Sequence, residues 1–483
     1  MQTRLFAAVS VALLVTTSAA HADDWPSGYS KCAGQGATCK VGTDSRSVSF
    51  GIKDKFITKA LSGNVLCDVA TFGSDPYPGL AKKCAIGPVA SVTTPSVPVP
   101  APTPAPAPTP APAPSPAINA SIEAAPKTGW AGQNSGTTGG AAAPSSAIYL
   151  VNSPSQMLAA IKAQGNNPKI IKLYGTIDMA SSDNGGPFTS HDDQNVRNAI
   201  KLGSNTTLIG VGSDTRLVNA SISITGVQNV ILRNLNIVNP CDVGPVWDKD
   251  DGDAGNWNSE FDSVTISGSK NVWVDHNVFS DTPVTDNMLP VQNGKIKECH
   301  DGSLDVKKGS DFVTVSNNRF ELHQKNNLIG SSDSTTSDNG HLTVTFNNNH
   351  FLNVAERSPR VRFGKVHVYN NYFEGSRTHA IYPHHYSIGV GYLAKIISQN
   401  NAFDIAGATS CTNVVTNPGS SSKTGAMTDT GSLLNGAALN FSGKCSFSSA
   451  VGWTLPYSAP LLPAADVKQS VLANAGTGKL TVK

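Results

Sequence analysis

Three segments of the chain carry charged residues inside otherwise apolar, strand-like sequence. They are NSEFDSVTISGSKNVWVDH (258–276), DGSLDVKKGS (301–310) and NNNHFLNVAERSPRVRFG (347–364). Asp301 and Asp305 are four residues apart and Glu260 and Asp262 are two apart, so on strands each pair shares one face. Clustered carboxylates repel unless a cation neutralises them, and a flexible oxygen cluster favours calcium. The alternative is an acidic face turned to solvent, and the residues alone leave both open.

Basic residues follow these acids along the chain. Arg357, Arg360 and Arg362 lie in ERSPRVRFG, and Lys325 precedes them. Arginine binds carboxylates through two parallel hydrogen bonds, so bases beside a cation site indicate an anionic ligand. The alternative is a salt-bridged surface loop.

The elements that must position these groups form an internal repeat. Each copy has an alternating β-branched run, a polar turn with Asn and an apolar residue that opens the next strand. The copies are NVILRNLNI (229–237), NVWVDHNVF (271–279), FVTVSNNRF (312–320), LTVTFNNNHF (342–351), KVHVYNNYF (365–373) and AKIISQNNAF (394–403). A period of about 22 residues with insertions predicts a coil of short parallel strands, stacked about 4.8 Å apart.

Asparagine suits the turns of such a coil for two reasons. It tolerates the left-handed backbone conformation, and its amide can hydrogen-bond the Asn above and below. A β-sandwich would need hairpin turns that these boundaries lack, and a propeller would need a period of about 40. Residues 169–177 and 206–226 are the expected first rungs, and a helix over 153–165 is expected to cap the open end.

The beginning of the chain and its cysteines indicate export. Residues 1–22 are predicted to be a signal peptide, with Arg4 before an apolar run and small residues at the cleavage site. Eight cysteines without zinc-site spacing favour disulfides. Their spacing does not decide the pairing, but we expect Cys241–Cys299 and Cys411–Cys445. The net charge of +2, with no basic stripe, gives no indication of nucleic acid.

Composition divides the rest of the chain into two units and a linker. The linker is predicted over 91–146, because 94–118 is a stiff Pro-Ala repeat and 119–146 is a Gly/Ala/Ser-rich continuation. Residues 23–90 form a small all-β module that needs its cysteines for stability, and 147–483 form the main unit. The module's aromatic residues either stack on sugars or fill its core: Trp25, Tyr29, Phe50, Phe72 and Tyr77.

The main unit resembles the pectate lyases of polysaccharide lyase family 1. NVWVDH matches their vWiDH signature, DGSLDVKKGSDFVTVSNNRF their calcium-ligand segment, and RSPRVRFGKVHVYNNYF their R-x-P-x-x-R segment. The resemblance implies an all-β, right-handed parallel β-helix. It also implies a secreted, monomeric enzyme that cleaves α-1,4-linked polygalacturonate by calcium-dependent β-elimination into 4,5-unsaturated oligogalacturonates. No nucleic acid or membrane partner is implied.

The resemblance also implies roles for single residues. Asp262, Asp301 and Asp305 would bind Ca²⁺, with Glu260 as a further acid found in some members. Arg357 would be the catalytic base, while Lys325 and Arg362 would bind substrate carboxylates. Asp275 and His276 of the signature would support the site structurally.

Three other functions fit parts of the same pattern. A polygalacturonase-type hydrolase would share the fold, and Asp250-Asp251 forms one of its motifs, but its NTD and RIK motifs are absent. A pectin lyase would replace the acidic ligands. A non-catalytic adhesin would have no need for Lys325, Arg357 and Arg362 together.

Overall fold

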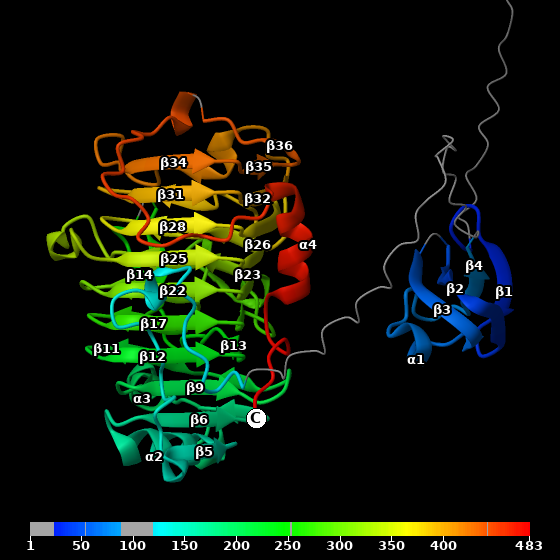
Figure 1. The fold of residues 1–483 in the computed structure, drawn as a ribbon, viewed down its shortest axis with the longest axis horizontal. Helices are drawn as coiled ribbons and strands as arrows, with labels where there is room; N and C mark the ends of the chain where they lie inside the picture. Colours follow the sequence, from blue (N-terminus) through cyan, green and yellow to red (C-terminus); the bar gives the residue numbers. More distant parts are fainter. Residues whose placement is uncertain (1–23, 54, 88–118, 252–253, 442) are drawn as a thin grey trace, which may run out of the picture. The chain divides into compact units, whose positions relative to one another are not determined.

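The computed structural model describes residues 24–53, 55–87, 119–251, 254–441 and 443–483, which form two compact units (Figure 1). The predicted signal peptide lies outside the described residues, as does the Pro-Ala repeat of the predicted linker. Among the described residues, no helix has the length and apolar character needed to span a membrane.

The small unit is a four-stranded antiparallel sheet in the order β1-β4-β2-β3. Its elements are β1 (Ser30–Gly34), β2 (Thr38–Ile52), β3 (Lys55–Leu66), helix α1 (Val69–Phe72) and β4 (Lys83–Ile86). Phe50 and Phe72 stack at 5.0 Å in its core, and the disulfides Cys32–Cys39 and Cys67–Cys84 close it. The prediction of a disulfide-stabilised β module is confirmed.

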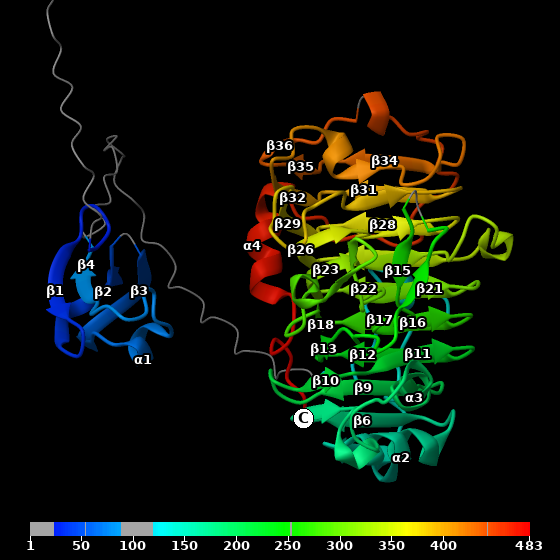
Figure 2. The same cartoon turned by 180° about the vertical axis from the view of Figure 1, so that it is seen from behind.

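The large unit is a coil of three parallel sheets, seen from opposite sides in Figures 1 and 2. The first sheet contains β5 (Ile148–Val151), β6 (Lys169–Leu173), β9 (Thr206–Gly210), β12 (Gln228–Arg233), β17 (Lys270–Asp275), β22 (Asp311–Ser316), β25 (Thr343–Asn347), β28 (Lys365–Tyr369), β31 (Lys395–Gln399) and β34 (Ala426–Thr430). The second contains β7 (Thr176–Asp178), β10 (Arg216–Val218), β13 (Asn236–Val238), β18 (Val278–Ser280), β23 (Arg319–Lys325), β26 (His350–Glu356), β29 (Tyr372–Ser376), β32 (Ala402–Ala406) and β35 (Leu433–Leu434), with β36 (Ala437–Ala438) antiparallel at its edge.

The third sheet contains β8 (Ala199–Lys201), β11 (Ser221–Thr225), β16 (Val264–Ser267), β21 (Leu304–Lys307), β24 (Asn327–Ile329), β27 (Arg360–Val361), β30 (Ile388–Val390) and β33 (Val415–Thr416). Two short hairpins project from the coil, β14 (Val246–Asp248) with β15 (Asn256–Asn258) and β19 (Val291–Gln292) with β20 (Lys295–Ile296). This architecture confirms the predicted right-handed parallel β-helix.

The interior of the coil repeats the same side chain at the same place in successive turns. The rings of Phe279, Phe320, Phe351, Phe373 and Phe403 stack with centroid distances of 4.8, 5.2, 4.8 and 4.4 Å. All five are buried, and they are the apolar residues that close the copies of the repeat. Their offset stacking adds to the burial of apolar area that holds neighbouring turns together.

The two roles expected of the turn asparagines are divided between consecutive residues. The first residue of each turn is left-handed, with φ of 52° at Asn317, 55° at Asn348 and 52° at Asn370. The second is a buried Asn whose Oδ1 accepts hydrogen bonds from the backbone and side chain of the Asn one turn earlier, at 2.9–3.1 Å. This ladder runs through Asn277, Asn318, Asn349, Asn371 and Asn401.

Helices and extended segments cover the open end and sides of the coil. Helix α2 (Pro154–Gln164), capped by Ser153, buries Met157 and Ala160 against the first turn, as predicted for 153–165. The helix α3 (His191–Arg197) precedes β8, and α4 (Ala464–Asn474) packs on β29 and β32.

Residues 119–146 are part of the large unit, so the linker predicted over 91–146 ends earlier than expected. Ala125 and Ala131 pack on Ile231 and Trp273 of the first sheet. The composition resembles that of a linker because small residues are required where backbone lies flat on a sheet: a Cβ on Gly140 would fall 1.9 Å from a backbone oxygen. The backbone N–H of Ala120 donates to the carbonyl of Thr481 at 2.9 Å, so the two ends of this unit lie side by side.

The two disulfides of the large unit have the expected pairing. Cys241 joins Cys299 and Cys411 joins Cys445. No cysteine of the described residues is free.

Replacing Asn349 by Ala should lower the free energy of unfolding by about 3 kcal/mol. The change removes the acceptor of the Asn318 amides and the donor to Val315, and each buried polar group left unpaired costs about 1–3 kcal/mol. Urea unfolding followed by circular dichroism measures the difference. The matched control is the exposed Asn474→Ala, expected to change stability by less than about 0.5 kcal/mol. Equal stability of the two variants would contradict a structural role for the ladder.

Candidate functional site

The predicted acids and bases lie on four successive turns of the coil, along the third sheet and its corner with the second (Figure 2). Asp262 precedes β16, Asp305 lies in β21, Lys325 ends β23 before β24, and Arg357 lies between β26 and β27. Residues 265, 305, 328 and 360 are in register across β16, β21, β24 and β27. The acids therefore occupy two neighbouring turns, and the bases occupy the next two.

Asp262 and Asp305 approach each other across Gly302. Both are buried, and the Oδ1 of Asp262 accepts the backbone N–H of Gly302 at 3.1 Å. A Cβ on Gly302 would lie 2.7 Å from Oδ1 of Asp305 and 2.8 Å from Oδ1 of Asp262. Glycine is therefore required for both carboxylates to point into the same space.

Lys307 is a member of this cluster that sequence reasoning missed. Its Nζ lies 3.1 Å from Asp262 and 3.6 Å from Asp305. The signal was present, because Asp305 and Lys307 are two residues apart on β21 and so share one face. Lys307 supplies one positive charge to a set of three carboxylates.

Two carboxylates of this cluster, those of Asp301 and Asp305, remain hard to ionise in spite of Lys307. Burial, together with Asp262, raises the pKa of Asp301 to about 6, against the lowering effect of Lys325, Arg357 and Lys307. Burial and Asp262 also raise the pKa of Asp305 well above its usual range. Such a site favours an added cation.

The donor set fits a hard cation such as calcium. The donors are carboxylate oxygens. The space beside the Oδ1 atoms of Asp262 and Asp305 is open because Gly302 has no Cβ. The set is open, because among the described residues Asp262, Asp301 and Asp305 do not all come within 4.8 Å of one another. An open set leaves room for ligand oxygens from another molecule.

Glu260 has a different neighbourhood from Asp262. Its side chain is 69% exposed, and its Oε2 lies 3.3 Å from Nε2 of His191. The ring of His191 stacks at 5.0 Å on Phe261, and its Nδ1 faces Asp242. Glu260 also lines a groove of about 470 Å³ on the third sheet, with Lys201 and Thr265.

Two of the predicted bases, Lys325 and Arg362, are paired with acids that sequence reasoning did not single out. Lys325 Nζ lies 3.0 Å from Oε2 of Glu298, and Nε of Arg362 donates to Asp333 at 2.8 Å. No spacing rule connects these residues, because Glu298 and Asp333 lie in corner loops. Lys325, just before β24, and Arg362, just after β27, are thus each partly neutralised.

Arg357 occupies a constrained position between the acids and the neighbouring turn. Its φ is 64°, a left-handed conformation that costs a non-glycine residue about 1 kcal/mol and often marks a functional position. Burial would lower the pKa of its guanidinium, but Glu356, with smaller effects from Tyr386, Asp305 and Asp301, outweighs burial and raises it. A cation on Asp301 and Asp305 would oppose their part of that effect.

Asp275 and His276 lie at the turn that ends β17, on the first sheet rather than the third. Asp275 is fully buried and pairs with Arg233 at 2.7 Å and with Nδ1 of His276 at 2.6 Å. It also accepts hydrogen bonds from Ser316 and Asn317 of the next turn. His276 has φ of 54° and takes the left-handed place that Asn has in other turns.

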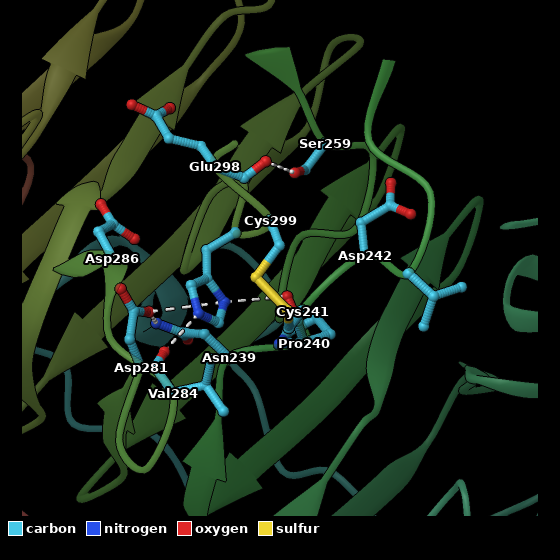
Figure 3. The surroundings of a disulfide bond; sticks show 12 residues. Asn239, Pro240, Cys241, Asp242, Ser259, Asp281, Val284, Asp286, Glu298 and Cys299 are labelled. Carbon is cyan, nitrogen blue, oxygen red and sulfur yellow. Dashed lines mark hydrogen bonds and ion pairs between the residues drawn. A yellow bond between two sulfur atoms is a disulfide. The ribbon is translucent and has the colours of Figure 1, made fainter. Parts of the chain in front are cut away.

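A second cluster of ligating groups surrounds the Cys241–Cys299 disulfide. Figure 3 shows Asp281 and Asp286 on one side of this bond and Asp242 on the other. Asp281, Asp286 and His300 come within 4.8 Å of one another. Both nitrogens of His300 face backbone carbonyls, at 3.1 and 2.8 Å, so neither is free to bind a metal. We interpret this cluster as a structural network behind the site.

The comparison with protein families identifies this arrangement. The family model described as "Pectate lyase" matches residues 116–480. Pectate lyase E of Dickeya dadantii is 45% identical over 366 residues, which cover 74% of this chain and 87% of that protein. The pectate lyase of Bacillus subtilis is 36% identical over 391 residues, covering 73% and 92%.

Solved structures agree with the sequence relatives. A structure titled "Pectate lyase bound to hexasaccharide" superposes with a TM-score of 0.71 at 35% identity, covering 75% of this chain and all of the other. Together with the extent of the family match, this similarity shows that the chain belongs to the pectate lyase family and is a pectate lyase.

Proposed function

We propose that this pectate lyase is secreted and cleaves α-1,4-linked polygalacturonate by calcium-dependent β-elimination, releasing 4,5-unsaturated oligogalacturonates. The observation that carries the proposal is that three carboxylates lie in or beside β16 and β21 while three cations lie beside β24 and β27, the neighbouring strands of the same sheet. The paired cysteines of the described residues support export, because such bonds persist in oxidising compartments.

Asp262, Asp301 and Asp305 would hold the calcium ion, with Glu260 as a further acid. Calcium, when bound, would withdraw electron density from a substrate carboxylate and make the neighbouring C5 proton more acidic. Lys307 would stay beside Asp262 and keep part of the cluster ionised before the ion arrives.

The three basic residues would have different roles toward the substrate. Lys325 and Arg362 would bind uronate carboxylates and stabilise the negative charge that develops as the C5 proton leaves. Glu298 and Asp333 would position them. Arg357 would remove the C5 proton, after which the C4–O4 bond breaks, a C4–C5 double bond forms and the leaving oxygen takes a proton from water. Asp275 and His276 would act only by holding the turn.

Near-ultraviolet absorbance during incubation with polygalacturonate tests the reaction itself. We expect absorbance from the unsaturated product to rise with added calcium and to stop rising when excess chelator is added. Loss of viscosity without a rise in absorbance would mean hydrolysis. An undiminished rise under chelator would remove calcium from the proposal.

Arg357→Ala should lower kcat by about a hundred- to ten-thousandfold, the usual contribution of a positioned base. For the unmodified chain, kcat/KM should rise with pH through the alkaline range. The base is active only without its proton, and neighbouring acids raise the pKa of Arg357. Arg216→Ala, an exposed arginine on β10, is the control. An acidic optimum would exclude Arg357 as the base.

Gly302→Ala should weaken calcium binding by about tenfold, within the range for residues that orient ligands. The added Cβ would press on the Oδ1 atoms of Asp262 and Asp305 and force them apart. Isothermal titration with calcium gives the affinity. The control is Gly375→Ala, where the nearest atom to the new Cβ is 3.7 Å away. Unchanged affinity in Gly302→Ala would place the ion elsewhere.

A further inference from the structure

The small unit concentrates positive charge. Residues 24–87 contain eight Lys and Arg against five Asp and Glu, an excess larger than the +2 of the whole chain. The rest of the chain therefore has no net positive charge of its own. The small unit is therefore opposite in charge to polygalacturonate, the anionic polymer of the proposed function.

The aromatic residues of the small unit fall into two groups. Phe50 and Phe72 are buried and form the core. Tyr29 packs its ring on Gly87 and bonds Ser47 through its hydroxyl. Trp25 and Tyr77 are half-buried and lie outside the core cluster. Their rings are therefore not explained by the stability of the module.

The ammonium group of a lysine lies over each of these two rings. Nζ of Lys83 lies 5.8 Å from the ring centre of Trp25, and Nζ of Lys53 lies 5.9 Å from that of Tyr77. Asp24 lies next to both pairs, because its carboxylate pairs with Lys83, and Lys83 together with the backbone of Lys53 lowers the pKa of that carboxylate. Lys83 is opposite Gly51 in the sheet, and Lys53 follows the end of β2. Both pairs therefore lie at the same end of the sheet.

We propose that Trp25, Tyr77, Lys53 and Lys83 form a binding site for a de-esterified galacturonan chain, separate from the catalytic corner. An aromatic face stacks on the apolar face of a sugar ring, as it does on other flat partners. An ammonium group beside the ring supplies a charge for the carboxylate that each galacturonate residue carries. A site for neutral sugars would need the rings and would have no use for the lysines.

The choice of polyuronate among polyanions rests on the proposed function. The enzyme's own substrate is the anionic polymer that the attached module would meet. Binding there would hold the enzyme on its substrate through the linker and raise the effective substrate concentration at the catalytic corner.

Affinity electrophoresis of the full-length chain tests this site. The Arg357→Ala background prevents cleavage of the gel-embedded polymer. We expect polygalacturonate to retard the chain, and Lys53→Gln/Lys83→Gln and Trp25→Ala/Tyr77→Ala each to weaken binding at least about tenfold, a usual cost for losing central contacts. Lys40→Gln/Lys59→Gln removes the same charge from exposed positions of β2 and β3 and should bind normally.

Two further measurements, together with the lysine control, decide the outcome. Trp25→Phe keeps a ring and should restore most of the binding, which separates loss of contact from misfolding. Equal retardation by fully methyl-esterified pectin would overturn the proposal, because that polymer lacks the charge. Loss of binding in the Lys40/Lys59 control equal to that in the Lys53/Lys83 variant would also overturn it, since only total charge would then matter.

The proposed function is checked separately in the same set of variants. With Arg357 intact, turnover of short soluble oligogalacturonates should be the same with and without the substitutions in the small unit. Turnover without retardation would reject the binding site alone. Retardation without turnover would reject the proposed reaction alone.

Discussion

The stacking of each turn of the chain directly on the turn before it is the constraint on which the rest of this structure depends. Parallel strands about 4.8 Å apart leave no freedom in register, so equivalent residues meet equivalent residues. The Phe stack and the Asn ladder are consequences of that rule. The same rule brings Asp305, Arg360 and their neighbours into one column from segments far apart in the chain.

Stacking also explains why the candidate functional site has a high density of charge. Residues on adjacent turns cannot move apart, so burial and the nearby Asp262 together raise the pKa values of Asp301 and Asp305. Lys307 offsets part of that repulsion, and the partners of Lys325 and Arg362 offset charge on the basic side. The candidate site is thus a set of partly compensated charges that the backbone holds close together.

The sequence predicted the coil, the capping helix and the segments of the site, because a repeat in the sequence is a repeat in space. It did not predict that the left-handed residue and the ladder residue are two different positions, since both are usually Asn. It also missed Glu298 and Asp333, whose loops have no periodicity to place them. The predicted linker extends too far, because Gly and Ala are common both in flexible linkers and in chain that packs flat on a sheet. Only the contacts of Ala125 and Ala131 distinguish the two cases.

The hydrogen bond between Ala120 and Thr481 has a consequence for how the large unit can be rearranged. The two ends of the large unit are neighbours, so a short loop could join them. A new break could then be opened in an exposed corner loop on the side of the coil away from the ladder. The order in which the turns follow one another would change, while every rung kept its neighbours. For this fold, circular permutation is therefore a matter of reconnecting loops, and an added domain could be joined at either end and begin from the same point on the surface.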